Sequence, residues 1–112
     1  MRFNMFILKN SAKLGLDNTK LNINDWIGKL QEEFTETKIE AEMYRVFRSA
    51  DRREKLVSEI LDTIQVCIAG LDMLEKENAD IKQAIIKHNT KLLSEREWTI
   101  NKNINIEVSE VE

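Results

Sequence analysis

The sequence contains no proline and only three glycines in 112 residues, so it is poor in the residues that end helices and form tight turns. A third of the residues are charged. This composition favours long helices over sandwiches or barrels, which need many turns. A chain of this length forms one small domain and buries roughly two-thirds of the surface of its unfolded chain. We therefore expect an all-α fold with a thin core.

Apolar residues at helical spacing predict three helices, which cover about residues 25–47, 53–74 and 78–93. Asn22 is suited to cap the first helix, and Asn78 is suited to cap the third. The polar stretch 48–54 is predicted to connect the first two helices. Residues 1–21 form a segment without a clear pattern, and the tail 99–112 alternates like a short strand or stays without regular structure.

The first two predicted helices each have two apolar sides. The main stripe of the second helix consists of Leu56, Val57, Ile60, Ile64, Cys67, Ile68, Leu71 and Leu74. Its opposite side carries two acids and continues as Val66, Ala69 and Met73. The first helix has Trp26 on its main stripe and an acidic side that continues as Met43 and Phe47. Three helices cannot cover all these faces, so we expect a dimer or tetramer that completes a bundle of four or more core helices. The faces expected to need this cover are the ones that carry Met43, Phe47, Val66 and Met73.

Two short acidic motifs point to chemistry. The first helix contains QEEFTE, with Glu33 and Glu36, and the second contains SEILDT, with Glu59 and Asp62. Each pair is three residues apart, so both carboxylates project from one face of their helix. Two such pairs on facing helices would supply four hard oxygen donors around one point. That arrangement is typical of a magnesium site.

The alternative for these acids is a solvated acidic face, which is the common role of clustered charges. Their placement argues against it, because both acidic sides turn apolar one or two turns further on. An acidic cluster that is partly buried costs several kcal/mol for each unneutralised charge. A divalent cation, Mg²⁺ with Mn²⁺ as a substitute, removes this cost.

The two motifs together resemble the EExxE…ExxD signature of the MazG-like, all-α nucleoside triphosphate pyrophosphohydrolases. In this sequence the signature is KLQEEFTE followed by SEILDTIQVCIAGLDML, with 22 residues between Glu36 and Glu59. The segment IIKHNTKLLSEREW (85–98) is similar to the Lys-rich closing helix of that family, although Glu97 stands where the family form has glycine. The resemblance covers residues 22–98, which are identified as a MazG-like helical catalytic domain.

The resemblance implies hydrolysis of a nucleoside triphosphate to a monophosphate and pyrophosphate. It implies that Glu33, Glu36, Glu59 and Asp62 hold the metal, with Glu32 as the base that orients the attacking water or as a group that supports the metal ligands. A solvated helix position is an equally good role for Glu32. The implied cellular role is housekeeping of the nucleotide pool.

The sequence has no phosphate-binding GxxxxGK[ST] loop. We therefore expect basic side chains, together with the metal, to bind the substrate phosphates. Lys91 and Arg96 are candidates to bind the substrate, with surface solvation as their alternative. Trp98 is a candidate to stack on the base. The only histidine, His88, and the only cysteine, Cys67, offer little support for nucleophilic catalysis, since Cys67 falls on an apolar stripe.

The remaining bulk properties limit the partners. A net charge of −3 gives no reason to expect nucleic-acid binding, and no apolar run approaches the ~20 residues that span a membrane. One cysteine forms no internal disulfide, which predicts a cytoplasmic protein. The rival to a hydrolase is a helical interaction protein without enzymatic activity, whose acidic face binds a basic partner.

Overall fold

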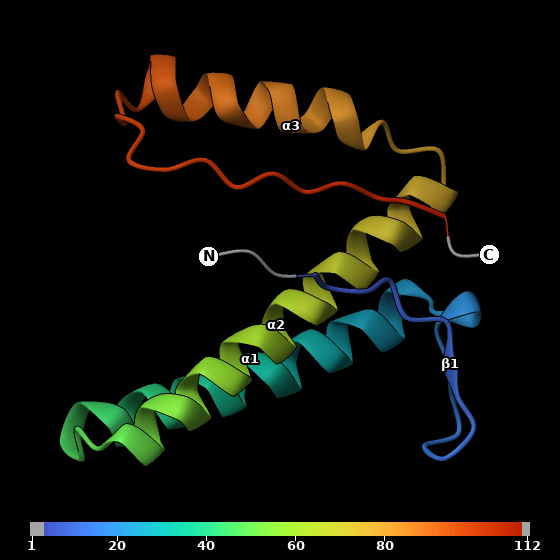
Figure 1. Ribbon diagram of the computed structural model, residues 1–112. Helices are drawn as coiled ribbons and strands as arrows, with labels where there is room; N and C mark the ends of the chain where they lie inside the picture. Colours follow the sequence, from blue (N-terminus) through green and yellow to red (C-terminus); the bar gives the residue numbers. More distant parts are fainter. Residues whose placement is uncertain (1–3, 111–112) are drawn as a thin grey trace. The chain divides into compact units, whose positions relative to one another are not determined.

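The computed structural model describes residues 4–110, which are mostly helical (Figure 1). Within this range the α-helices are α1 (Ile23–Val46), α2 (Ala50–Lys76) and α3 (Ile81–Thr90), and α3 continues as a π-helical turn, η2 (Lys91–Glu95). The N-terminal segment forms a small antiparallel hairpin of β1 (Asn10–Ser11) and β2 (Leu16–Asp17), followed by a 3₁₀ turn, η1 (Asn18–Lys20). The all-α prediction is confirmed in this general form.

The chain divides into two compact units, Met1–Ala79 and Asp80–Glu112. The first contains the N-terminal hairpin with α1 and α2, and the second contains α3, η2 and the tail. The predicted catalytic domain, residues 22–98, crosses this division. None of the helices between residues 4 and 110 is long and apolar enough to cross a membrane.

Side-chain caps fix the ends of α1 and α2. As predicted, Asn22 caps α1, because its side chain accepts a hydrogen bond of 2.9 Å from the Asp25 amide. Ser49 caps α2 in the same way, because its hydroxyl accepts a hydrogen bond of 3.2 Å from the Arg52 amide. The predicted connection over 48–54 was therefore too long. A serine cap followed by Asp51 in the first turn starts the helix at Ala50.

The start of α3 also differs from the prediction. Asn78 does not cap this helix but adopts a left-handed conformation (φ 70°) just beyond the end of α2. Asp80 is the cap, since its carboxylate accepts a hydrogen bond of 2.9 Å from the Gln83 amide. The strand-like alternation of the tail forms no strand between residues 99 and 110, where no neighbouring strand pairs with it.

Helices α1 and α2 lie side by side as an antiparallel hairpin (Figure 1). Near the open end, the Trp26 indole N–H donates 2.9 Å to the Val66 carbonyl. The same indole ring lies against Gly70, where an added Cβ would come within 2.6 Å of the Trp26 Nε1 atom. Glycine at position 70 therefore lets the two helices approach closely.

The hairpin packs through its acidic sides, joined by Trp26, which was predicted on the main stripe of α1, and it leaves most of the main apolar stripe of α2 exposed. Met73, on the acidic side, is 7% exposed and is the only buried hydrophobic residue among those described. Ile64 and Leu71 on the opposite stripe are 39% and 49% exposed, and Cys67 is exposed as well. The predicted core role of Cys67 is thus wrong within one chain. The surface that needs cover is the stripe, not the side that carries Met73.

The N-terminal segment is held against this hairpin. The Gln65 side-chain amide donates to the Phe6 carbonyl, which ties the start of the segment to α2. Asn18 joins the two ends of this segment. Its backbone N–H donates a hydrogen bond to the Lys9 carbonyl (2.7 Å), and its side-chain amide donates one to the Leu8 carbonyl (3.3 Å). Gly15 takes the left-handed conformation (φ 67°) that the tight turn of the hairpin requires.

Candidate metal centre

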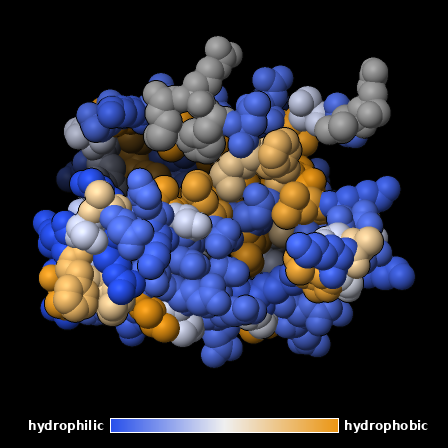
Figure 2. All heavy atoms as spheres, turned by 60° about the horizontal axis from the view of Figure 1, so that its bottom comes forward, coloured by the Kyte–Doolittle hydropathy of each residue, from blue (hydrophilic) through white to orange (hydrophobic). Residues whose placement is uncertain are grey.

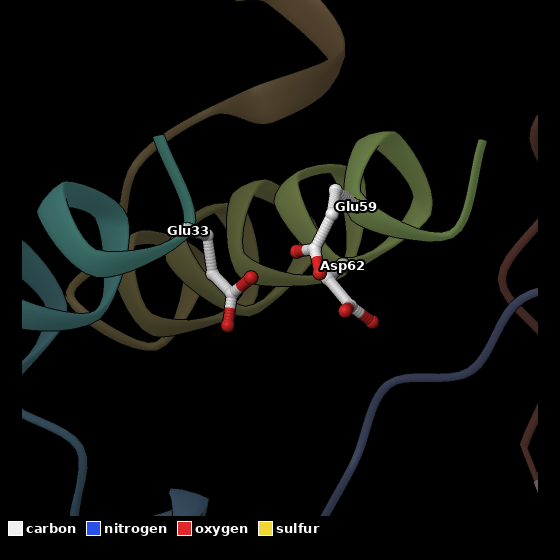
Figure 3. A group of neighbouring side chains, drawn as sticks. All are labelled: Glu33, Glu59 and Asp62. Carbon is white, nitrogen blue, oxygen red and sulfur yellow. The ribbon is translucent and has the colours of Figure 1, made fainter. Parts of the chain in front are cut away.

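Three of the four predicted metal ligands meet between α1 and α2 (Figure 3). Glu33 comes from α1, and Glu59 and Asp62 come from successive turns of α2. One carboxylate oxygen of each lies within 4.8 Å of the other two. Oxygens bound to one Mg²⁺ are at most about 4.2 Å apart, given bonds of about 2.1 Å. The separation of these oxygens is therefore close to the upper limit for three ligands of one ion.

Two of these acids have oxygens that nothing else satisfies. Oε2 of Glu33 and Oε2 of Glu59 are buried and have no hydrogen-bond partner among the described residues. Buried polar atoms are rarely left without a hydrogen-bond or ligand partner, so these two oxygens favour a bound cation. The donors are all carboxylate oxygens, which are the ligands that Mg²⁺ and Mn²⁺ prefer over softer metals. The residues present fit a hard divalent cation.

The electrostatics of the centre lead to the same conclusion. Burial raises the pKa of Glu33, and the neighbouring charges of Glu36, Asp62, Glu59 and Glu32 raise it further. Burial also raises the pKa of Glu59, and the neighbouring charges of Glu36, Asp62 and Glu40 raise it further. The uncompensated centre thus favours protons, and a bound cation would replace them.

The structure places Glu36 close to the other acids but not in the group of three. It is half-buried, and its charge raises the pKa of both Glu33 and Glu59. Glu40 lies one turn further along α1 and faces the Arg52 guanidinium at 3.8 Å. Lys55, four residues before Glu59, pairs instead with Asp51 at 3.5 Å. Within residues 4–110, no salt bridge reaches Glu33, Glu36, Glu59 or Asp62.

Two threonines, which the sequence motifs did not single out, fix the backbone beneath Glu59. The hydroxyls of Thr37 and Thr63 lie 2.8 Å apart, and each is 3.1 Å from the Glu59 carbonyl. Each hydroxyl has one proton, so one donates to the other while the carbonyl accepts from the second. Both residues lie on the acidic sides of their helices, one residue after Glu36 and Asp62 respectively. Their position next to the motif was the available signal.

Glu32, the predicted base, is exposed on α1 and is not among the three converging acids. Consecutive residues of a helix point about 100° apart, so Glu32 projects away from the side that carries Glu33. It is one of the residues that line a cavity between the start of α1 and the N-terminal segment. From there, Glu32 borders the metal centre without contributing to it.

The predicted substrate residues lie in the second unit, on η2 and just beyond it. The π-helical turn ends at Glu95, and the Arg96 amide bonds to the Lys91 carbonyl at 3.0 Å. Lys91 is half-buried, Arg96 is exposed, and Trp98 is 67% exposed. These side chains are available to a ligand. Their approach to the acidic centre stays a prediction.

Glu97 occupies a backbone position that suits glycine. It has a left-handed conformation (φ 55°), which costs a residue with a Cβ about 1 kcal/mol relative to glycine. This is the position at which the sequence departs from the closing motif that it resembles. The conformation ends the helical segment and turns the chain before Trp98, whose amide bonds to the Leu92 carbonyl at 3.0 Å.

Comparison with protein-family models, curated proteins and solved structures finds no match for this chain. The resemblance to MazG-like enzymes thus rests on the motif residues, and the geometry of the acids is independent of it.

Proposed function

We propose that this protein is a magnesium-dependent nucleoside triphosphate pyrophosphohydrolase of MazG-like type. The observation that carries the proposal is the convergence of Glu33, Glu59 and Asp62, two of which have buried oxygens without partners. Such a cluster is stable with a divalent cation and costly without one. Its combination with the EExxE…ExxD spacing favours a phosphate-cleaving site over a purely structural ion site.

Under this proposal Glu33, Glu59 and Asp62 hold Mg²⁺, with Glu36 completing the set. The bound ion supplies charge neutralisation for the triphosphate and favours attack by water at phosphorus. Mn²⁺ can take its place because it accepts the same oxygen ligands.

The protein's own residues then orient the reactants. Glu32, whose charge raises the pKa of Glu33, is the proposed base: it takes the proton of the attacking water, which adds to the α-phosphorus and releases pyrophosphate. Lys91 and Arg96 bind the departing β- and γ-phosphates, Lys91 as a point charge and Arg96 as a planar fork. Trp98 stacks on the base.

Product analysis tests the reaction. A panel of ribo- and deoxyribonucleoside triphosphates is incubated with Mg²⁺ or with EDTA, and the products are separated by ion-exchange chromatography. We expect a monophosphate and pyrophosphate in the Mg²⁺ samples alone. Orthophosphate and a diphosphate as main products would contradict the assigned bond. Absence of turnover for the whole panel would favour the rival, an acidic interaction protein.

We further propose that the hairpin associates with copies of itself, as a dimer or tetramer in the cytoplasm. The α2 stripe supports association, because Val57, Ile60, Ile64, Leu71 and Leu74 are each 39% to 51% exposed. In Figure 2, hydrophobic residues, coloured orange, are exposed on the face of the molecule that is drawn. A second copy would cover the stripe and complete a helical bundle.

A further inference from the structure

A cavity of about 710 Å³ lies between the N-terminal segment and the start of α1. Residues from the segment 15–21 form one wall, and Asn24, Asp25, Gly28, Lys29 and Glu32 of α1 form the other. Its volume falls in the range of about 300–1,000 Å³ that is typical of small-molecule sites. Among these lining residues, the sequence motifs assigned a role to Glu32 alone.

The cavity adjoins the acidic centre through two residues of α1. Glu32 lines it, and the next residue, Glu33, belongs to the converging acids. Lys29 lines it one helical turn before Glu33 and also borders a smaller cavity of about 200 Å³ under the N-terminal hairpin. A ligand that occupies the larger cavity can therefore extend past Lys29 to the acids.

The walls offer polar groups that are not already used. Neither Lys20 nor Lys29 forms a salt bridge with any of residues 4–110. In the same range, the side chains of Asn24 and Asp25 make no hydrogen bonds. Leu21 adds apolar surface, and nothing lies within 4 Å of where a Cβ on Gly28 would be. Two lysines, two amides, three carboxylates and an apolar patch line one cavity and match the mixed chemistry of a nucleotide with its metal.

We infer that this cavity binds the nucleoside monophosphate half of the substrate, an inference that rests on the proposed function. Lys29 binds the α-phosphate next to the acidic centre. Asn24 and Asp25 form hydrogen bonds with the sugar and base, and Leu21 covers the apolar face of the base.

A titration of ¹⁵N-labelled protein with AMP and with dCMP, each in the presence of Mg²⁺, locates the binding site directly. We expect the amide signals of Gly15, Gly28 and Lys29 to shift in a saturable way for at least one of the two probes. Inorganic pyrophosphate, used as a third probe, should leave these signals unchanged. Saturable shifts confined to other residues, or no shifts at millimolar concentration, would overturn the inference.

Variants add a quantitative measure. Lys29→Gln should weaken binding of the monophosphate by about fivefold or more, which is about 1 kcal/mol, whereas Lys38→Gln, an exposed α1 lysine outside the cavity, should not change it. Asn24→Ala should raise KM for the triphosphate more than it lowers kcat, with Gln31→Ala as its control. An unchanged Kd for Lys29→Gln in a folded variant would contradict the assignment.

The two failures are distinguishable. If no triphosphate is hydrolysed but AMP or dCMP shifts the cavity signals, the hydrolase proposal fails and the nucleotide site stands. If triphosphate is hydrolysed and the cavity signals do not respond, the cavity assignment alone fails.

Discussion

Glu33 and Glu59 keep carboxylates in partly buried positions beside other acids, and this arrangement has a measurable cost in the metal-free protein. Their raised pKa values mean that folding favours the protonated forms. The folded protein therefore binds more protons than the unfolded chain between the usual glutamate pKa, near 4.5, and the raised values. Stability from this source is complete below that window and is lost as pH rises through it.

We predict that, in EDTA, the melting temperature falls as pH rises from 4.5 through the raised pKa values of Glu33 and Glu59. Glu59→Gln should flatten this slope, and Glu54→Gln, an exposed acid of α2, should keep it. Asp17 does not contribute to this slope above pH 4.5, because its hydrogen bonds with Thr19 lower its pKa below 3.8. Thermal melts at several pH values measure the slope, and a slope equal in all three proteins would contradict the assignment.

Gly70 and Gly28 form a matched pair of glycine positions within helices. A Cβ at Gly70 would meet the Trp26 indole at 2.6 Å, whereas a Cβ at Gly28 would meet nothing within 4 Å. We predict that Gly70→Ala destabilises the protein by about 1–3 kcal/mol through overpacking. Gly28→Ala should stabilise it by about 0.5–1 kcal/mol, because alanine restricts the unfolded chain. Urea unfolding measures both, and equal effects would refute the close approach at Trp26.

At the scale of elements, the sequence predicted α1, α2 and the facing acids because each depends on local spacing along one helix. It missed the length of α2 because a single cap, Ser49, outweighed a run of polar residues. It misplaced the surface that needs cover, because the periodicity identifies two apolar sides of α2 but not which side meets α1. The contacts of Thr37 and Trp26 decide that choice, and they join residues 22 to 40 positions apart.

The segment after α3, which contains Lys91 and Arg96, is predicted from the sequence to bind the substrate. Lys91→Ala and Arg96→Ala should each lower kcat or raise KM at least tenfold, about 1.4 kcal/mol of lost transition-state binding. Magnesium should still stabilise both variants, since the acids are unchanged. Lys102→Ala, an exposed lysine of the tail, serves as the control. Steady-state kinetics within twofold of the parent for both variants would remove this element from the site.

At the scale of the whole molecule, the bare stripe of α2 predicts association. Ile64→Lys should lower the oligomeric state or weaken association, because a charge would lie at the centre of the covered surface. Ser58→Lys adds the same charge to the same helix outside the stripe and should leave association unchanged. Light scattering at micromolar concentration distinguishes the two. A 13.1 kDa particle for the parent protein would contradict the prediction.

Glu33, Glu59 and Asp62 are proposed to form a magnesium site, and a thermal melt with Mg²⁺ or EDTA tests this site without knowledge of the substrate. At a Mg²⁺ concentration ten times its Kd, binding stabilises the folded protein by about 1.4 kcal/mol. We predict this gain for the parent protein and its loss in folded Glu59→Gln and Asp62→Asn variants, which should also lose most activity. An equal response to Mg²⁺ in parent and variants, or no response in any of them, would contradict the account.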